Sequence, residues 1–185
     1  MTVAGLLGSL EALSLATSIR QSLYLFPLVE AVHVIGLTMV FGTILIIDLR
    51  LLGLASSRRP FTAVAADVLR WTWAAFALTA VTGVLMFITN AGSYYVNPYF
   101  RAKMALLILA GINMAAFELT TRRSVHAWDR DAAAPVMGRF VATASLIIWI
   151  GVIFLGRWVG FTLTSTTGPG GTEINLDGLE DLIPK

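Results

Sequence analysis

Residues 26–48 read FPLVEAVHVIGLTMVFGTILIID, an apolar run that carries Glu30 and His33 in its first third and ends at Asp48. A helix needs ~20 apolar residues to cross the hydrocarbon core of a bilayer, and this run meets that length. Three further stretches match it, at about residues 68–89, 102–121 and 140–162. The sequence therefore predicts an all-α membrane protein with four transmembrane helices.

The overall composition supports the same class. Hydrophobic residues make up 57% of the 185 residues and charged residues 13%, whereas soluble domains have ~45–50% and ~25%. Four spans with short loops leave no room for a soluble catalytic module. The absence of cysteine excludes disulfides, iron–sulfur ligation and thiolate zinc sites. With a net charge of only +2, we expect a lipid bilayer and other membrane protein subunits as partners, and no nucleic acid.

The two ends of the chain predict different structures. Near the N-terminus, leucines recur at helical spacing with Glu11 on the opposite side, a pattern typical of an amphipathic helix in the membrane interface. Near the C-terminus the composition shifts to glycine, proline and acidic residues. The predicted domains are an interfacial amphipathic helix (1–22), a four-helix transmembrane domain (23–163) and a flexible acidic tail (164–185).

The distribution of basic residues predicts the topology. The loops after the first and third spans, with the span ends beside them, hold eight of the thirteen basic residues, whereas residues 90–100 carry no charge. By the positive-inside rule the arginine-rich side is cytoplasmic, so both termini are expected outside, on the side of the periplasm or its equivalent. The eight residues are Arg50, Arg58, Arg59, Arg70, Arg122, Arg123, Arg130 and Arg139. Short loops make consecutive spans antiparallel neighbours in an up-down bundle.

Ionisable residues inside a span each cost ~2.5–3.5 kcal/mol on insertion scales, so each needs a partner or a function. Glu30 and His33 are three residues apart and share one helical face. His33 lies about seven residues, or roughly 10 Å, below the outer edge of its span. We predict that these two side chains converge in the outer third of the bundle with four others. The four are Met86, Met104, Lys103 and Arg157.

This set allows three interpretations. In a structural interpretation, Glu30 and Arg157 form an ion pair, His33 is a hydrogen-bonded core residue and the methionines fill gaps. In a cofactor interpretation, His33, Glu30 and Arg157 bind the cofactor, and His33 with Met86 and Met104 supplies metal ligands. Imidazole with a thioether suits Cu(I) or a haem iron, so haem b or copper is the expected cofactor. In a third interpretation, Glu30 and His33 relay protons.

The inner ends of the spans carry a second polar set. We expect Asp48 to pair with Arg70 and Glu118 with Arg122, at a depth where long side chains reach water. Asn113, in the middle of the third span, is expected to hydrogen-bond across helices.

Several motifs carry a resemblance. They are EAVHVIGL (30–37), Phe41-Gly42 continuing to DLRLLG (48–53), NPYFRAKM (97–104) and GRW (156–158). Together they resemble a family of small bacterial inner-membrane proteins of unknown function, which implies a four-helix fold and a location but no activity.

A histidine early in a span is also loosely similar to copper-resistance membrane proteins and b-type cytochrome subunits. The cytochromes use paired histidines on facing spans. Here the second histidine, His126, lies in the cytoplasmic loop, most of a ~30 Å bilayer away from His33. We therefore do not expect one haem to be held by both histidines of the chain.

The leading functional hypothesis is a redox- or metal-associated membrane subunit with its site near the outer face, around His33. The alternative is a non-catalytic accessory or assembly subunit of a larger membrane complex. A small transporter is disfavoured because the sequence shows no internal repeats or broken helices. Whether the protein is an enzyme stays open from the sequence.

Overall fold

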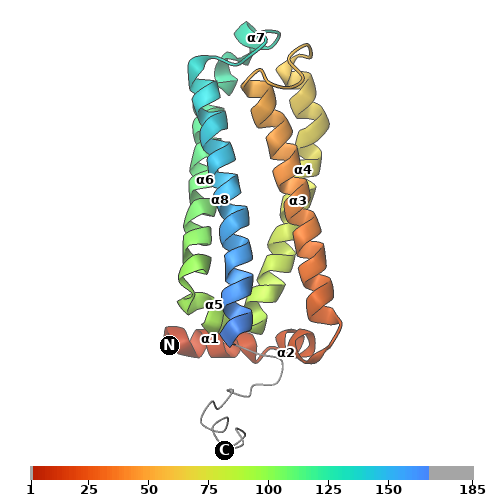
Figure 1. Ribbon diagram of the computed structural model, residues 1–185, viewed down its shortest axis with the longest axis vertical. Coiled ribbons are helices and arrows are strands. Elements are labelled where there is room, and N and C mark those ends of the chain that lie inside the picture. The colour runs from red at the N-terminus through yellow and green to blue at the C-terminus, as the bar shows by residue number, and fades with distance from the viewer. Residues whose placement is uncertain (1, 167–185) are drawn as a thin grey trace, which may run out of the picture.

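The fold is a bundle of four long helices with short helices at its two ends (Figure 1). The computed structural model describes residues 2–166, with side chains through residue 163, and this part of the chain contains no strand. The long helices are α3 (Leu25–Leu51), α4 (Phe61–Thr89), α6 (Pro98–Thr120) and α8 (Val136–Thr166). The short helices are α1 (Val3–Glu11), α2 (Ser14–Gln21) and α5 (Ala91–Val96) at one end, and η1 (Arg122–Ser124) and α7 (Val125–Trp128) at the other.

The predicted fold class is confirmed, because four helices in the described residues are long and apolar enough to cross a membrane. Local capping chemistry sets where the helices begin. Pro60 precedes α4, and Pro98 is the first residue of α6, a position where its missing N–H costs nothing. Asn97 caps α6, since its Oδ1 accepts from the N–H groups of Tyr99 and Phe100 at 2.9 and 3.1 Å. From residue 167 onward, the predicted acidic tail lies outside the described residues.

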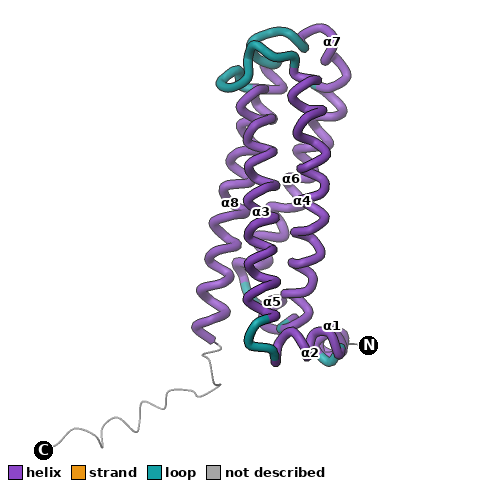
Figure 2. Tube along the Cα trace, turned by 90° about the vertical axis from the view of Figure 1, so that its right-hand side faces the viewer, coloured by secondary structure: helices purple, strands orange, loops and turns teal. Residues whose placement is uncertain are grey.

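The bundle consists of two hairpins. Helices α3 and α4 pack along each other as one antiparallel hairpin, and α6 and α8 as the other. The hairpins meet through α3 and α8, whereas α4 and α6 make little contact (Figures 1 and 2). A core of buried side chains fills the middle of this junction. Its members are Val40, Ala75, Ile148, Trp149 and Val152.

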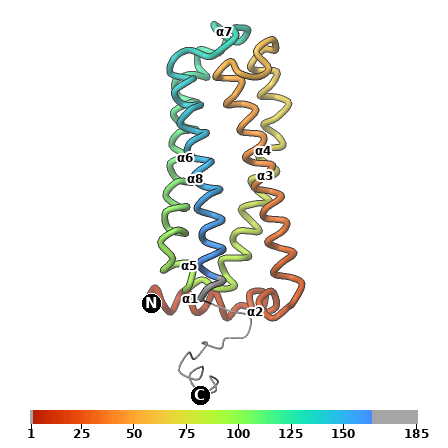
Figure 3. Tube along the Cα trace, viewed as in Figure 1, coloured from red at the N-terminus to blue at the C-terminus, as the bar shows by residue number. Residues whose placement is uncertain are grey.

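The N-terminal segment lies across the end of the bundle where α3 begins and α8 ends (Figures 2 and 3). It forms two helices rather than the single predicted one, because the chain is extended at Leu13. Two contacts hold it in place. Glu11 Oε1 accepts from the Gly92 N–H at 2.8 Å, and Arg20 Nη1 donates to the Thr89 carbonyl at 3.2 Å. The Glu11 carboxylate is therefore tied to the start of α5.

Arg50 joins the loops at the opposite end of the bundle. Its side chain is fully buried, although the residue type is almost never buried without partners. Its guanidinium group donates to four backbone carbonyls at 3.0–3.3 Å. The acceptors are Arg59 in the loop after α3, and Asp129, Asp131 and Ala132 in the loop before α8. One side chain thus connects both loops to the last turn of α3.

Asp129 completes this junction by capping α4. Its Oδ1 accepts from the Thr62 N–H at 2.8 Å and its Oδ2 from the Thr62 hydroxyl at 3.0 Å. The backbone hydrogen bond from Thr62 is the main cause that holds the pKa of the Asp129 carboxyl below its usual value, and the nearby Arg130 and Arg50 charges add to it. The carboxylate therefore stays ionised and keeps its capping role in mildly acidic solution.

Replacing Arg50 should destabilise the protein far more than replacing an exposed arginine nearby. Arg50→Met removes the side-chain donor from four backbone carbonyls, of which that of Asp129 still accepts from the Phe61 N–H. Each of the other three loses its donor at a cost of ~1–3 kcal/mol, so we expect a loss of at least ~3 kcal/mol. Arg50→Lys should recover only part of it, since an ammonium cannot reproduce the planar fork. Thermal unfolding of the purified protein in detergent measures the effect. Arg58→Met is the control, and equal losses in the two variants would contradict the assigned role of Arg50.

Candidate functional site

His33 lies in the first third of α3 and faces α4. Its Nδ1 is 3.0 Å from the hydroxyl oxygen of Thr82, which is a buried residue. The Thr82 hydroxyl itself lies 2.8 Å from the Leu78 carbonyl, one helical turn back, and donates to it. Because a hydroxyl has a single proton, it accepts the hydrogen bond from Nδ1–H of His33. This arrangement places the ring proton on Nδ1 and leaves the lone pair on Nε2.

Two glycines allow the ring to fit between the helices. A Cβ at Gly83 would lie 3.1 Å from His33 Cε1, closer than most real contacts of this kind. One turn after the histidine, a Cβ at Gly36 would lie 2.5 Å from the Thr79 hydroxyl, which is too close to accommodate. The missing side chains therefore set the close approach of α3 and α4 at the level of His33.

Lys103 reaches the same region from the second hairpin. It is half-buried on α6, and its side chain runs along Gly156 of α8, where a Cβ would lie 3.5 Å from Nζ. Its positive charge is close enough to act on the His33 ring. An ammonium at this depth favours a ligand with negative charge and disfavours a second cation. The site thus combines one imidazole, one buried hydroxyl and one cation from α3, α4 and α6.

The expected ion pair between Glu30 and Arg157 is not formed. Glu30 is exposed. Burial is the main cause that raises the pKa of Tyr94 in α5 to about 12, and the charge of Glu30 adds to it. Arg157 is also exposed, with its guanidinium 4.6 Å from the ring centroid of Phe161. Thr82, rather than Glu30, holds Nδ1 of His33. The ion-pair prediction was wrong because the rotation of each helix about its axis places both charges on the outside.

The predicted thioether ligands come from α4 and α6. Met86, near the end of α4, and Met104, near the start of α6, are both half-buried. Their role as ligands stays a prediction. Within the described part of the chain, no three or more His, Cys, Asp or Glu side chains gather as a metal-binding cluster. His126 is exposed on α7 at the far end from His33, which agrees with its exclusion as a haem partner.

The burial and the partner of Asp48 differ from the prediction. Instead of pairing with Arg70 at the interface, it is only 5% exposed and lies beside Ser145 of α8. Its Oδ2 is buried without a hydrogen-bond partner in the described residues. Arg70 turns away and lies 5.9 Å from the ring of Trp71. The expected pair was wrong because Asp48 faces α8 in the hairpin junction and Arg70 is exposed on α4.

Two other predicted polar contacts are confirmed. Arg122 and Glu118 form an ion pair at 2.6 Å, one turn apart at the end of α6. Asn113 Nδ2 donates to the Val141 carbonyl at 3.1 Å and so links α6 to α8. The ion pair was predictable because the two residues are four apart on a helix. The contact of Asn113 was predictable because an amide in the membrane needs an acceptor.

The sequence analysis missed Thr82 as a partner of His33. A signal was present, because Thr79, Thr82 and Gly83 stand at i, i+3 and i+4 in an otherwise apolar span. Residues at that spacing lie on one face of a helix, and small or hydroxyl-bearing residues are typical of helix contacts in membranes. This pattern identifies the face of α4 that packs on α3.

The family of the chain follows from comparison with known proteins. The model of a family described as "Family of unknown function (DUF6644)" matches residues 20–162, a range that contains His33, Thr82 and Lys103. No curated protein and no solved structure matches the chain. The looser similarity to copper-resistance proteins and cytochrome subunits therefore has no support from named relatives. The match covers well over half of the chain, which belongs to this family of unknown function, DUF6644.

Proposed function

We propose that this membrane protein is a redox-associated subunit in which His33 binds a cofactor, and that haem b fits the site better than copper. The supporting observation is the hydrogen bond from Nδ1 of His33 to Thr82. Metal-ligating histidines almost always donate their second nitrogen to a fixed acceptor, which sets the tautomer and the orientation of the ring. Nε2 of His33 is then the ligand atom.

Lys103 favours haem over a bare copper ion. Its ammonium acts on the His33 ring, and a further cation placed there would be repelled. Haem instead brings two carboxylate groups, for which Lys103 is a suitable partner and Arg157, exposed at the same end, a second one. When bound, the haem iron would supply one-electron chemistry. A thioether from Met86 or Met104 would be the second protein group to hold the haem.

The alternative function is a non-catalytic accessory or assembly subunit. One observation favours it: α6 contains no buried residue from Pro98 to Thr120. Much of its surface is therefore available to lipid or to another membrane protein. Gly111 and Ala115, both exposed and one turn apart on α6, would allow a close helix contact. In this case His33 serves packing between α3 and α4, and the protein carries no cofactor.

Cofactor content of the protein isolated gently from its native membrane separates the two functions. We expect a Soret absorption band with stoichiometric iron, lost in His33→Ala and retained in the matched control His126→Ala. Thr82→Val should weaken binding by roughly 10–100-fold, as changes behind a metal ligand typically do. Of Met86→Leu and Met104→Leu, only the change at the methionine that binds the cofactor should reduce binding. The other change should leave binding intact and cost under ~1.5 kcal/mol of stability. Wild-type protein without stoichiometric haem or metal would overturn the proposal in favour of the accessory function.

We also propose that the membrane is the bacterial inner membrane and that both termini lie on its periplasmic side. The support is the excess of arginine at the end formed by η1, α7 and the loop after α3. The chain has no cysteine of its own, so single cysteines can be placed freely. Ser93→Cys should react with a membrane-impermeant thiol reagent added to intact cells, and Ser57→Cys should react only after lysis. The reverse pattern would place the His33 site at the cytoplasmic face.

A further inference from the structure

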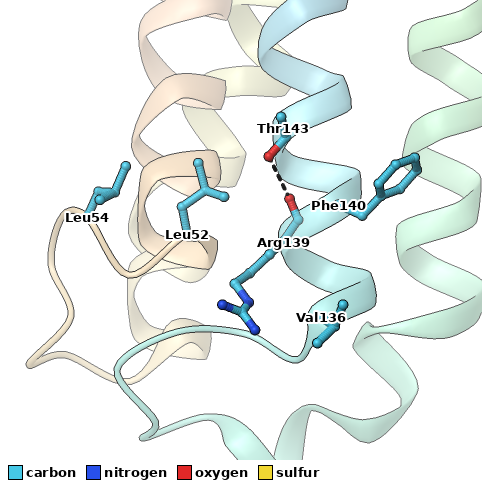
Figure 4. Close-up of a pocket in the computed structure, with 6 residues that line it drawn as sticks. All are labelled: Leu52, Leu54, Val136, Arg139, Phe140 and Thr143. Carbon is cyan, nitrogen blue, oxygen red and sulfur yellow. Dashed lines mark hydrogen bonds between the residues drawn. The ribbon is translucent and has the colours of Figure 1, made fainter.

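A groove opens on the surface at the arginine-rich end, separate from the His33 site (Figure 4). It has a volume of about 620 Å³ and lies between the loop after α3 and the first turns of α8. Five of its side chains carry no charge, and three of these, Leu54, Val136 and Phe140, are exposed. The lining residues are Leu52, Leu54, Val136, Arg139, Phe140 and Thr143.

Arg139 is the one charged side chain in the lining of this groove. It extends from α8 on the side where Val136 lies (Figure 4). Within the described residues its guanidinium takes part in no ion pair and no hydrogen bond, whereas Arg50, Arg59 and Arg122 at the same end are all engaged. An arginine with five free donors is suited to a phosphate group.

The start of α8 adds to the positive potential of the groove. Val136, the first residue of α8, lines it. The first N–H groups of a helix have no partner within the helix, and the helix dipole places partial positive charge there. Helix starts therefore bind phosphate groups readily, and here the start of the helix stands beside an unpaired guanidinium.

The rest of the lining indicates an amphipathic ligand. From Arg139 the groove continues along α8 to Phe140 and Thr143, toward the middle of the membrane-spanning helix. A free anion would contact only the basic part, whereas a lipid would place its phosphate at Arg139 and an acyl chain over the apolar part. Basic pockets at the ends of transmembrane helices bind anionic headgroups in this way.

We propose that this groove binds an anionic phospholipid, with the headgroup phosphate at Arg139 and the start of α8. The proposal is independent of the cofactor at His33, because it rests on residues at the opposite end of the bundle. Phosphatidylglycerol is the probe for the test, and phosphatidylcholine with identical acyl chains is the zwitterionic reference.

Native mass spectrometry of the full-length protein, released from detergent after incubation with equal amounts of both lipids, measures the preference. An arginine near an anionic headgroup contributes ~1 kcal/mol, which corresponds to roughly fivefold in binding. We therefore expect a roughly fivefold preference of the wild-type protein for phosphatidylglycerol. Arg139→Gln should abolish that preference, and Arg123→Gln, an exposed arginine at the same end but outside the groove, should retain it. Unchanged thermal unfolding of both variants shows that they are folded.

Four results would overturn the proposal. The wild-type protein could bind the two lipids equally, or Arg139→Gln could keep the preference, in which case the groove does not select the headgroup. Arg123→Gln could lower the preference for phosphatidylglycerol as much as Arg139→Gln does, and the preference would then come from the overall charge of this end. Displacement of phosphatidylglycerol by inorganic phosphate would show that the site takes a free anion, because phosphate cannot occupy the apolar part of the groove.

Discussion

The buried guanidinium of Arg50 is the interaction on which the arrangement of the two hairpins depends. It connects the loop between α3 and α4 with the loop that leads into α8, through hydrogen bonds to four backbone carbonyls. Apolar helices in lipid gain little from burying one face rather than another, so specific polar contacts decide how they pair. By fixing α3 against the start of α8, Arg50 sets the junction along which the hairpins meet. The outer site needs that junction, because His33 and Lys103 come from different hairpins.

The polar groups inside the bundle are all subject to the same energetic constraint. Each is expensive in a low-dielectric environment, and each is therefore held at a defined position. His33 donates to Thr82, Asn113 donates to Val141, and Asp48 lies beside Ser145 while one of its oxygens has no partner in the described structure. These contacts lie at three depths along the bundle and link α3 to α4, α6 to α8 and α3 to α8. Of these groups, His33 and Thr82 also belong to the candidate site.

The sequence was sufficient for some of these features and insufficient for others. The four spans follow from length and composition, and the Glu118–Arg122 pair follows from helical spacing. The partner of His33, the burial of Asp48 and the role of Arg50 depend on how each helix is rotated about its axis. The spans are apolar all round, so no stripe of hydrophobic residues reveals that rotation. The Glu30–Arg157 pair failed for this reason: the two residues share a depth in the membrane but not a common face.

The tautomer of His33 tests the central claim most directly. The account requires that Nδ1 carries the ring proton, donated to Thr82, and that Nε2 presents its lone pair. Solid-state nuclear magnetic resonance of the cofactor-free protein in lipid, with ¹⁵N-labelled histidine, distinguishes protonated from bare ring nitrogens. The chain has two histidines, and a His126→Gln variant leaves the signal of His33 alone. The account predicts a protonated Nδ1 and a bare Nε2, whereas a proton on Nε2 with a bare Nδ1 would contradict it.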